Sequence, residues 1–382
     1  MSLVDRRKNP AGFLQRVVLR LTGRLRRAGD HGDSPAVDLR LELADIALSR
    51  IGHAAPQSPY SRAALPAGDP RFIARDAARG AVEHGFSMWQ EGRPTLIALT
   101  GPAGCGLTSI LNQVPTWLSE QMHVARLDLD RRPDATADAL ALATSVFGAQ
   151  VPYDSIDTAA AQINALPPQV VLVDNGHFLY SRLMGGSEGV RALHGLMVAT
   201  QGRHLWIVAC ETQAWRRQCD TARTHRYFDD VAELDYFSRD ELAALIAART
   251  PAGHAGPDAQ AIDALHRISR GHPALALFVA ERTLRDDTPA IPAPFDEAPL
   301  RELERTELLT LAEIAAHGTL TARELRSIFR RDDAGTSILL HHLRQSGLIV
   351  SGPHAGTEPG NRLEPLVAPM IIAHLVRANY LY

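Results

Sequence analysis

A glycine-rich stretch at residues 101–109, GPAGCGLTS, has the residue types and spacing of a phosphate-binding loop. The general motif is G-x-x-x-x-G-K-[ST], and the chain places Gly101, Gly106 and Thr108 at three of its four fixed positions. Glycines let the backbone turn tightly and approach a phosphate, whose charge is held by backbone N–H groups. We therefore expect a nucleotide-binding site formed by Gly101, Gly104, Cys105, Gly106, Leu107, Thr108 and Ser109.

The lysine of this motif is replaced by Leu107, which carries no charge for the phosphates. Loss of such a charge-assisted contact costs on the order of 2–4 kcal/mol. The chain has a single lysine, Lys8, but avoidance of lysine would favour arginine at this position, not leucine. We expect ATP or ADP to bind weakly or not at all, and phosphoryl transfer to be poor. The alternative is a chance glycine-rich turn.

A second polar position follows the apolar run VVLVD, where Asp174 ends a predicted buried strand. Thr108 and Asp174 are the expected Mg²⁺ ligands. Asn175 stands where a water-activating glutamate would be needed, and an amide is a very poor base. Nearby His177 could be a polar substitute for that glutamate, but we favour its interpretation as a surface residue. Cys105 is either a redox-sensitive thiol near a helix N-terminus or, the interpretation we favour, a small filler.

Four apolar segments predict strands that alternate with helical or loop segments, at residues 96–100, 123–129, 170–174 and 205–210. This alternation predicts an α/β fold with a three-layer parallel sheet, and the uninterrupted apolar runs suit strands buried on both faces. Beyond residue 236 we predict helices in 238–250 and 258–285, with Ser238 and Glu241 forming a capping box. A proline-rich linker follows.

The last segment has the pattern of a winged helix. Helices are predicted at residues 304–317, 322–329 and 336–345, strands at 347–352 and 361–365, and a closing helix at 368–380. In a DNA-binding version the third helix, with His341, His342, Arg344 and Gln345, would read the major groove. The wing offers only Arg362, opposed by Glu358, so protein contact is favoured over DNA contact.

Arginines and apolar residues in residues 1–30 predict a basic amphipathic helix, and residues 36–52 predict a second amphipathic helix. The first could lie on an anionic membrane, dock on a partner, or form a solvated arm. The expected domains are an N-terminal arm (1–65), a P-loop α/β domain (66–235), a helical lid (236–287), a linker (288–300) and a winged-helix domain (301–382).

The order of these blocks resembles the AAA+ and STAND classes of P-loop ATPases, over about residues 71–382. The blocks are the glycine loop, VVLVDN, LWIVACETQ, a lid with GHPALAL, and the winged helix. The resemblance implies that Gly271-His272-Pro273 packs beside an adenine, which adds Pro273 to the nucleotide-binding residues. It also implies sensor residues, for which the candidates are Thr212 or Glu211, Arg216 or Arg217, and Arg270. Relatives assemble into rings or switch between monomer and oligomer.

The composition is that of an ordinary globular protein, with 45% hydrophobic and 22% charged residues in 382. A net charge of −3 argues against sequence-independent nucleic-acid binding by the whole chain. Three cysteines without metal spacing favour a reducing cytoplasm, and neither a membrane-spanning run nor a secretory signal is expected. We predict a degenerate nucleotide-binding regulator or scaffold, a pseudo-ATPase acting through protein partners. The alternatives are an active ATPase in which an arginine replaces the lysine, and a DNA-binding protein.

Overall fold

The computed structural model describes residues 59–148, 153–182, 187–250, 256–283, 298–352 and 358–382. The two amphipathic helices predicted at residues 1–30 and 36–52 therefore lie outside the described residues, as does most of the proline-rich linker. Residues 59–65, assigned from the sequence to the N-terminal arm, are described and contact the α/β domain.

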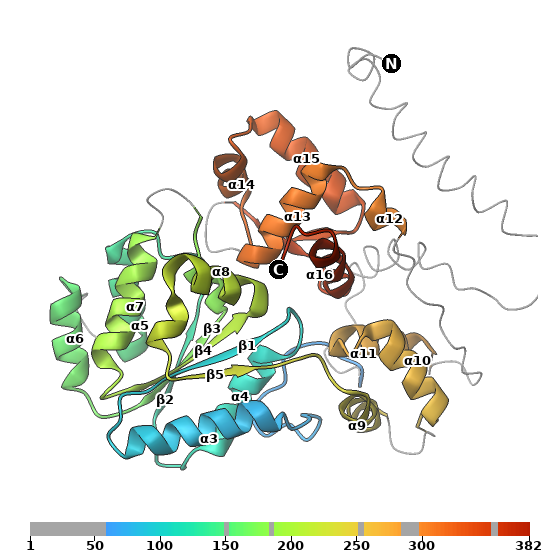
Figure 1. The fold of residues 1–382 in the computed structure, drawn as a ribbon. Helices are drawn as coiled ribbons and strands as arrows, with labels where there is room; N and C mark the ends of the chain where they lie inside the picture. Colours follow the sequence, from blue (N-terminus) through green and yellow to red (C-terminus); the bar gives the residue numbers. More distant parts are fainter. Residues whose placement is uncertain (1–58, 149–152, 183–186, 251–255, 284–297, 353–357) are drawn as a thin grey trace, which may run out of the picture. The chain divides into compact units, whose positions relative to one another are not determined.

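A five-stranded parallel sheet forms the centre of the α/β domain (Figure 1), as the sequence predicts. Its order is β2-β3-β4-β1-β5, so β1 lies between β4 and β5, next to the last strand of the sheet. The strands are β1 (Leu96–Gly101), β2 (Val124–Asp128), β3 (Val170–Asp174), β4 (Leu205–Glu211) and β5 (Asp230–Glu233).

Strand β5 is absent from the sequence-based prediction, which had only four strands. The four residues Asp-Val-Ala-Glu pair in parallel with β1, but only Ala232 among them is buried. An edge strand this short and polar has no apolar run by which to recognise it. The missed strand matters because it carries the chain from the sheet edge to the lid.

Helices cover both faces of the sheet, which makes the predicted three layers. Alternate strand residues enter two cores: Ile97 and Leu99 face α3 (Asp76–Gln90) and α4 (Leu107–Trp117), while Leu96 and Ala98 face the opposite core. The helices on or beside that opposite face are α5 (Thr136–Phe147), α6 (Ile156–Asn164), α7 (Glu188–Thr200) and α8 (Thr212–Ala222).

Three helices form the lid: α9 (Arg239–Arg249), α10 (Ala259–Ser269) and α11 (Pro273–Thr283). The predicted capping box is present, since Glu241 N–H donates to Ser238 Oγ and Ser238 N–H to the Glu241 carboxylate. The chain turns between α10 and α11 through Arg270 and Gly271, at φ 54° and 77°. A Cβ on Gly271 would lie 2.1 Å from the Phe237 carbonyl oxygen, so only glycine fits this turn.

Residues 298–382 form a C-terminal module of five helices and a hairpin in the part that is described. Helices α13 (Arg305–His317), α14 (Ala322–Phe329) and α15 (Asp333–Gln345) precede the antiparallel pair β6 (Ile349–Gly352) and β7 (Gly360–Leu363). A short α12 (Ala298–Arg301) begins the module and α16 (Ala368–Arg377) closes it. Apart from α12, most of which lies in the predicted linker, these are the helices and strands predicted from the winged-helix pattern, within a few residues at each end.

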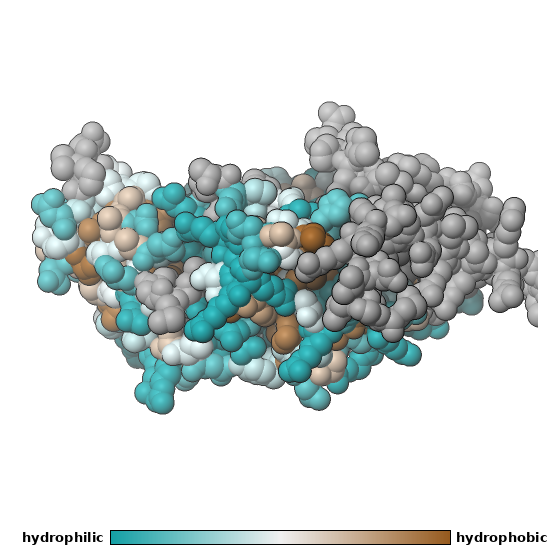
Figure 2. Space-filling view, turned by 90° about the horizontal axis from the view of Figure 1, so that it is seen from above, coloured by the Kyte–Doolittle hydropathy of each residue, from teal (hydrophilic) through white to brown (hydrophobic). Residues whose placement is uncertain are grey.

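One hydrophobic core runs from the lid into this module, and includes Phe237 and Leu277 from the lid region with Leu311 and Leu375 from the module. The larger hydrophobic side chains that remain exposed are scattered over the described surface, and brown patches in Figure 2 are small and separated by teal. No described helix combines the length and the apolar composition that crossing a bilayer requires.

Candidate functional site

The glycine loop lies where the motif predicts, between the end of β1 at Gly101 and the start of α4 at Leu107. Gly104 and Gly106 have φ of 78° and 103°, a left-handed conformation that favours glycine. Gly106 is the residue before the helix, and no side chain caps the N-terminus of α4. The first N–H groups of a helix have no partner within it, so this end of α4 can hold an anion.

Leu107 packs against the core between α4 and the sheet. The position that would carry the phosphate-binding lysine therefore stabilises the packing of the helix. It offers neither a donor nor a charge to a ligand.

A strap of residues 59–70 crosses α4 beside the loop. The Leu65 N–H donates to Ser109 Oγ at 3.1 Å, and Asn112 Nδ2 donates to the Leu65 carbonyl at 2.7 Å. Gln113, buried on the same helix, exchanges hydrogen bonds with Pro66 and Gly68. Ser109 is thus placed at the loop as expected, with its hydroxyl already accepting a hydrogen bond from the chain.

Cys105 is 1% exposed, and a Cβ on Gly101 would lie 2.5 Å from its sulfur. Burial raises the pKa of the thiol to about 12. A thiol this hard to ionise is a poor nucleophile, which agrees with the interpretation of Cys105 as a filler beneath the loop.

The lid contacts the glycine loop through His272, the middle residue of the predicted Gly-His-Pro motif. A Cβ on Gly104 would lie 2.3 Å from His272 Nε2, and burial lowers the pKa of this histidine to about 4. Tyr236 packs edge-on against the same ring and its hydroxyl donates to the Ala103 carbonyl at 3.1 Å. The neutral imidazole thus fills the space that the missing Gly104 side chain leaves.

Pro273, which begins α11, lines a small cavity of about 100 Å³ together with Gly104, Gly106 and Ser109. The lid motif therefore reaches the glycine loop. The strap lines the same cavity through Ser61 and Leu65.

Asp174 ends β3 at the sheet edge, and both of its carboxylate oxygens accept hydrogen bonds. Arg126 Nη2 donates to Oδ2 at 2.7 Å, and the Asn175 N–H donates to Oδ1 at 2.8 Å. Asn175 has φ 58°, and its Nδ2 donates to the Leu129 carbonyl at 2.9 Å. Arg126 was missed in the sequence, where it is one of many arginines; the parallel register of β2 on β3 brings it to Asp174.

A larger cavity of about 480 Å³ lies between the sheet edge and the C-terminal module. Residues singled out from the sequence line it, among them Gly104, Asn175, Thr212 and Arg216, although Asp174 and Thr108 do not. Glu211 also lines the cavity, and its removal from water there raises the pKa of the carboxyl group to about 7.

The remaining sensor candidates lie elsewhere. Arg217 Nη1 donates to the Tyr382 hydroxyl at 2.7 Å, and its guanidinium lies 4.6 Å from the centre of that ring. Arg270 forms the left-handed turn after α10 and lines neither of the two cavities. Of the arginines proposed from the sequence, Arg216 is the one at a cavity that includes the glycine loop.

His177 is buried at 7% exposure, so its interpretation as a surface residue was wrong. A Cβ on Gly318 of the C-terminal module would lie 2.6 Å from the His177 ring, and burial together with Arg132 and Arg362 lowers its pKa to about 3. The segment around Gly318, far later in the sequence, contributes to this burial, so no local sequence pattern could reveal it.

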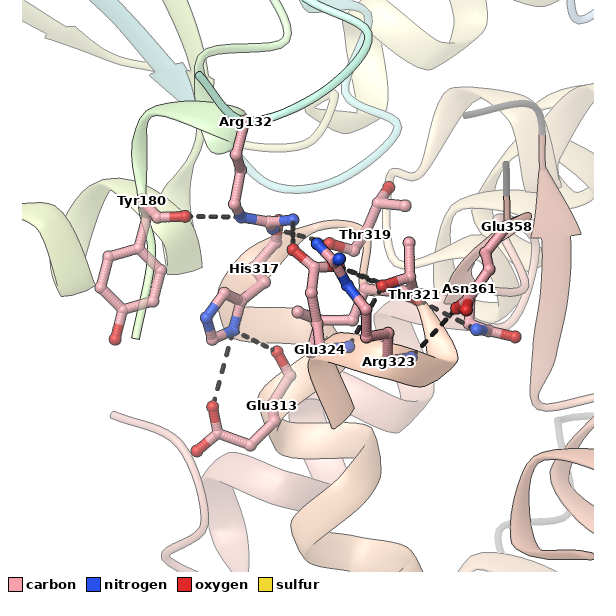
Figure 3. A network of polar contacts seen from close by, with 11 residues as sticks. Arg132, Tyr180, Glu313, His317, Thr319, Thr321, Arg323, Glu324, Glu358 and Asn361 are labelled. Carbon is pink, nitrogen blue, oxygen red and sulfur yellow. Dashed lines mark hydrogen bonds and ion pairs between the residues drawn. The ribbon is translucent and has the colours of Figure 1, made fainter. Parts of the chain in front are cut away.

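Arg132 joins the α/β domain to the C-terminal module (Figure 3), with a side chain 2% exposed. Its Nε donates to the Tyr180 carbonyl at 2.7 Å, and its Nη1 to Glu324 Oε1 at 2.8 Å. Its Nη2 donates to the carbonyls of His317 and Thr319 at 3.0 and 2.6 Å. Every guanidinium nitrogen is therefore satisfied, as a buried charge requires.

Two basic residues at or beside α15, Arg326 and His342, contact carboxylates of the module. Arg326 pairs with Asp333 and, at 3.8 Å, with Glu358; His342 Nδ1 lies 2.6 Å from a Glu307 oxygen. Ile338 on the outer side of α15 is 70% exposed. Reading DNA needs positive charge that carboxylates do not already compensate, and Arg326 and His342 both have carboxylate partners.

No protein-family model matches the sequence, and no curated protein matches it. The structure is similar to the ORC2 protein of Aeropyrum pernix in its ADP form, with 15% identity, a TM-score of 0.48, and coverage of 85% of this chain and 99% of that one. It is also similar to the Walker-type ATPase PABY2304 of Pyrococcus abyssi, with 14% identity, a TM-score of 0.45, and coverage of 81% and 99%.

Thermotoga maritima RuvB, a Holliday junction branch migration motor, is a third similar structure. It shares 16% identity with the chain at a TM-score of 0.39, over 77% of this chain and 94% of that one.

Proposed function

We propose that the chain is a nucleotide-binding regulatory protein that hydrolyses ATP weakly or not at all and acts through protein partners. The observation that carries the proposal is the uncapped N-terminus of α4 behind a loop of left-handed glycines. This arrangement presents backbone N–H groups to an anion without the help of a side-chain charge. The small cavity between loop, lid and strap extends the site toward the lid.

Weak hydrolysis follows from the side chains around this cradle. Leu107 is partly buried and packs against the core, and Asn175 uses its amide to hold the Leu129 carbonyl. Neither can stabilise the charge of a transferring phosphoryl group or activate a water molecule. A protein with a site of this kind can change state when nucleotide binds and when it is released, without a rapid chemical step.

Calorimetric titration with ADP and ATP tests the proposal. We expect the natural protein to bind nucleotide with a dissociation constant in the micromolar range. Leu107→Lys should bind about tenfold more tightly, because the lysine adds a charge-assisted contact that outweighs the loss of the leucine's packing against the core. The matched control is Ile338→Lys, which adds the same charge on exposed α15. Absence of binding by both the natural protein and Leu107→Lys would refute the proposal; binding by Leu107→Lys alone would make the domain a scaffold that has lost its ligand.

An active ATPase is the second candidate, because Arg216 lines the larger cavity with Gly104, Asn175 and Thr212. It predicts measurable turnover that Arg216→Gln and Asp174→Asn each abolish. Turnover that neither substitution changes would come from a contaminant.

Protein partners are proposed in preference to DNA, because Arg326 and His342 near α15 have carboxylate partners and Ile338 on this helix is exposed. A binding measurement with duplex DNA in low and moderate salt separates these ideas. Tight binding with a steep salt dependence would favour DNA. We propose a cytoplasmic location, with self-association and a membrane contact through residues 1–30 as further possibilities for experiment.

A further inference from the structure

Asp174 is the acid expected to order Mg²⁺ at the glycine loop, and its surroundings do not fit a metal ion. One oxygen accepts from Arg126 at 2.7 Å and the other from the Asn175 N–H at 2.8 Å, while the side chain is only 7% exposed. A carboxylate engaged in this way by a permanent cation has little negative charge left for a second cation. Within the described residues, no cluster of three or more His, Cys, Asp or Glu side chains could hold a metal.

Arg126 is held in place by three oxygen acceptors from three elements. Its Nε donates to Asp128 on β2, its Nη1 to Asn112 on α4, and its Nη2 to Asp174 on β3, each at 2.7 Å. An arginine fixed by three hydrogen bonds has lost its freedom to swing away, so its charge stays at this point.

The position of Arg126 relates it to the glycine loop. Asn112 lies four residues after Thr108 on α4, so the two side chains occupy the same side of the helix one turn apart. The guanidinium therefore lies between the helix that carries Thr108 and the strand that carries Asp174, the two expected metal ligands. A divalent cation brought there would have to displace this guanidinium, because it already occupies an oxygen of Asp174.

We infer that the glycine loop binds its nucleotide without magnesium, and that Arg126 supplies the positive charge at Asp174 that the ion would otherwise supply. The inference rests on the proposed nucleotide binding and specifies its ligand as metal-free ADP or ATP. Arg126 acts as a positioning residue: it keeps the Asp174 carboxylate neutralised, so that this carboxylate does not repel a phosphate held by the N–H groups of α4.

The test is calorimetric titration of the full chain with ADP, once in excess Mg²⁺ and once in excess EDTA. For the natural protein we expect dissociation constants that agree within about threefold. Arg126→Gln removes the charge and frees Asp174, so its binding should weaken in EDTA and become at least about tenfold tighter in Mg²⁺ than in EDTA. Arg126→Lys should keep part of the natural behaviour. The matched control is Arg131→Gln, which removes a charge from a side chain 53% exposed on the following loop.

Three results would overturn the inference. Natural protein that binds ADP at least about tenfold more tightly in Mg²⁺ would leave the proposed function standing and refute metal independence. An Arg126→Gln variant that stays folded by its thermal melt and gains no dependence on Mg²⁺ would show that Arg126 does not exclude the ion. No binding in either buffer would refute the nucleotide proposal and this inference together.

A spectroscopic readout supports the titration independently of heat. Electron paramagnetic resonance of Mn²⁺, used as a probe for Mg²⁺, should show no additional bound ion when the natural protein is added to metal and ADP. The Arg126→Gln variant should reduce the free Mn²⁺ signal under the same conditions. The opposite pattern would contradict the exclusion of the metal.

Discussion

Two arginines six positions apart in the sequence, Arg126 and Arg132, each pair with a carboxylate, but at very different burial. The side chain of Arg126 is 29% exposed and donates to three side chains of the α/β domain. The side chain of Arg132 is 2% exposed and donates mainly to backbone carbonyls, most of its acceptors lying in the C-terminal module. The first sets the charge beside the proposed nucleotide site, whereas the second holds two parts of the chain together.

The largest predicted difference is in stability. Arg132→Gln leaves Glu324 and buried carbonyls without their donor, and should lower the free energy of unfolding by about 3–5 kcal/mol. Arg126→Gln removes a partly exposed pair and should cost about 1 kcal/mol or less. Urea unfolding followed by circular dichroism measures both, with exposed Arg131→Gln as the control. Equal losses for Arg126 and Arg132 would show that burial does not distinguish the two sites.

A pH dependence should arise on the Arg132 side, from His177 and His317. Burial lowers the pKa of each to about 3, below the ordinary value near 6.5. The unfolded chain therefore binds more protons between these values, and stability is lost as the pH falls through this window. We expect each histidine to contribute on the order of 2 kcal/mol of that loss between pH 6.5 and pH 4.5.

The variant His177→Gln tests this prediction by its slope with pH, whatever its stability at pH 7. The slope of the unfolding free energy below pH 6.5 should become shallower than in the natural protein. His84→Gln, on the exposed side of α3, is the control and should leave the slope unchanged. An unchanged slope in His177→Gln would mean that this ring is protonated in the folded protein.

The smallest predicted effect concerns Glu211, which lines the larger cavity. Its pKa is raised to about 7, so its contribution to stability is present below the ordinary value of 4.5 and is lost as the pH rises through 7. Glu211→Gln should therefore stabilise the protein by roughly 1 kcal/mol at pH 8 and have almost no effect at pH 4.5. Thermal melts at both pH values measure it; the same shift at both would exclude titration of Glu211 as the cause.

Local patterns were sufficient for most of the sheet and for the glycine loop. Runs such as VVLVD at β3 and LWIVAC at β4 are buried on both faces. Their uninterrupted apolar sequence therefore predicts a strand without knowledge of the fold. Gly101 to Ser109 were placed by motif spacing alone. The boundary between α10 and α11 was not predicted, although Gly271 followed by Pro273 is a local helix-stop signal.

The charges that define the site were not predictable in the same way. Arg126 meets Asp174 through the register of two strands, and Arg132 meets Glu324 across 192 positions. His177 is buried by Gly318 from the far end of the chain. In a chain with many arginines, residue type alone does not distinguish Arg126 and Arg132 from arginines on the surface. Their roles depend on the carboxylates that they contact, and those contacts are set by tertiary structure.

The buried guanidinium of Arg132 also bears on how the molecule can be divided. A fragment ending before residue 298 would keep the positive charge and its Tyr180 acceptor, but would lose Glu324 and the carbonyls of His317 and Thr319. It would also expose the apolar residues that the lid shares with the module. The α/β domain with its lid is therefore a poor substitute for the whole chain, and separately produced halves should aggregate or recombine.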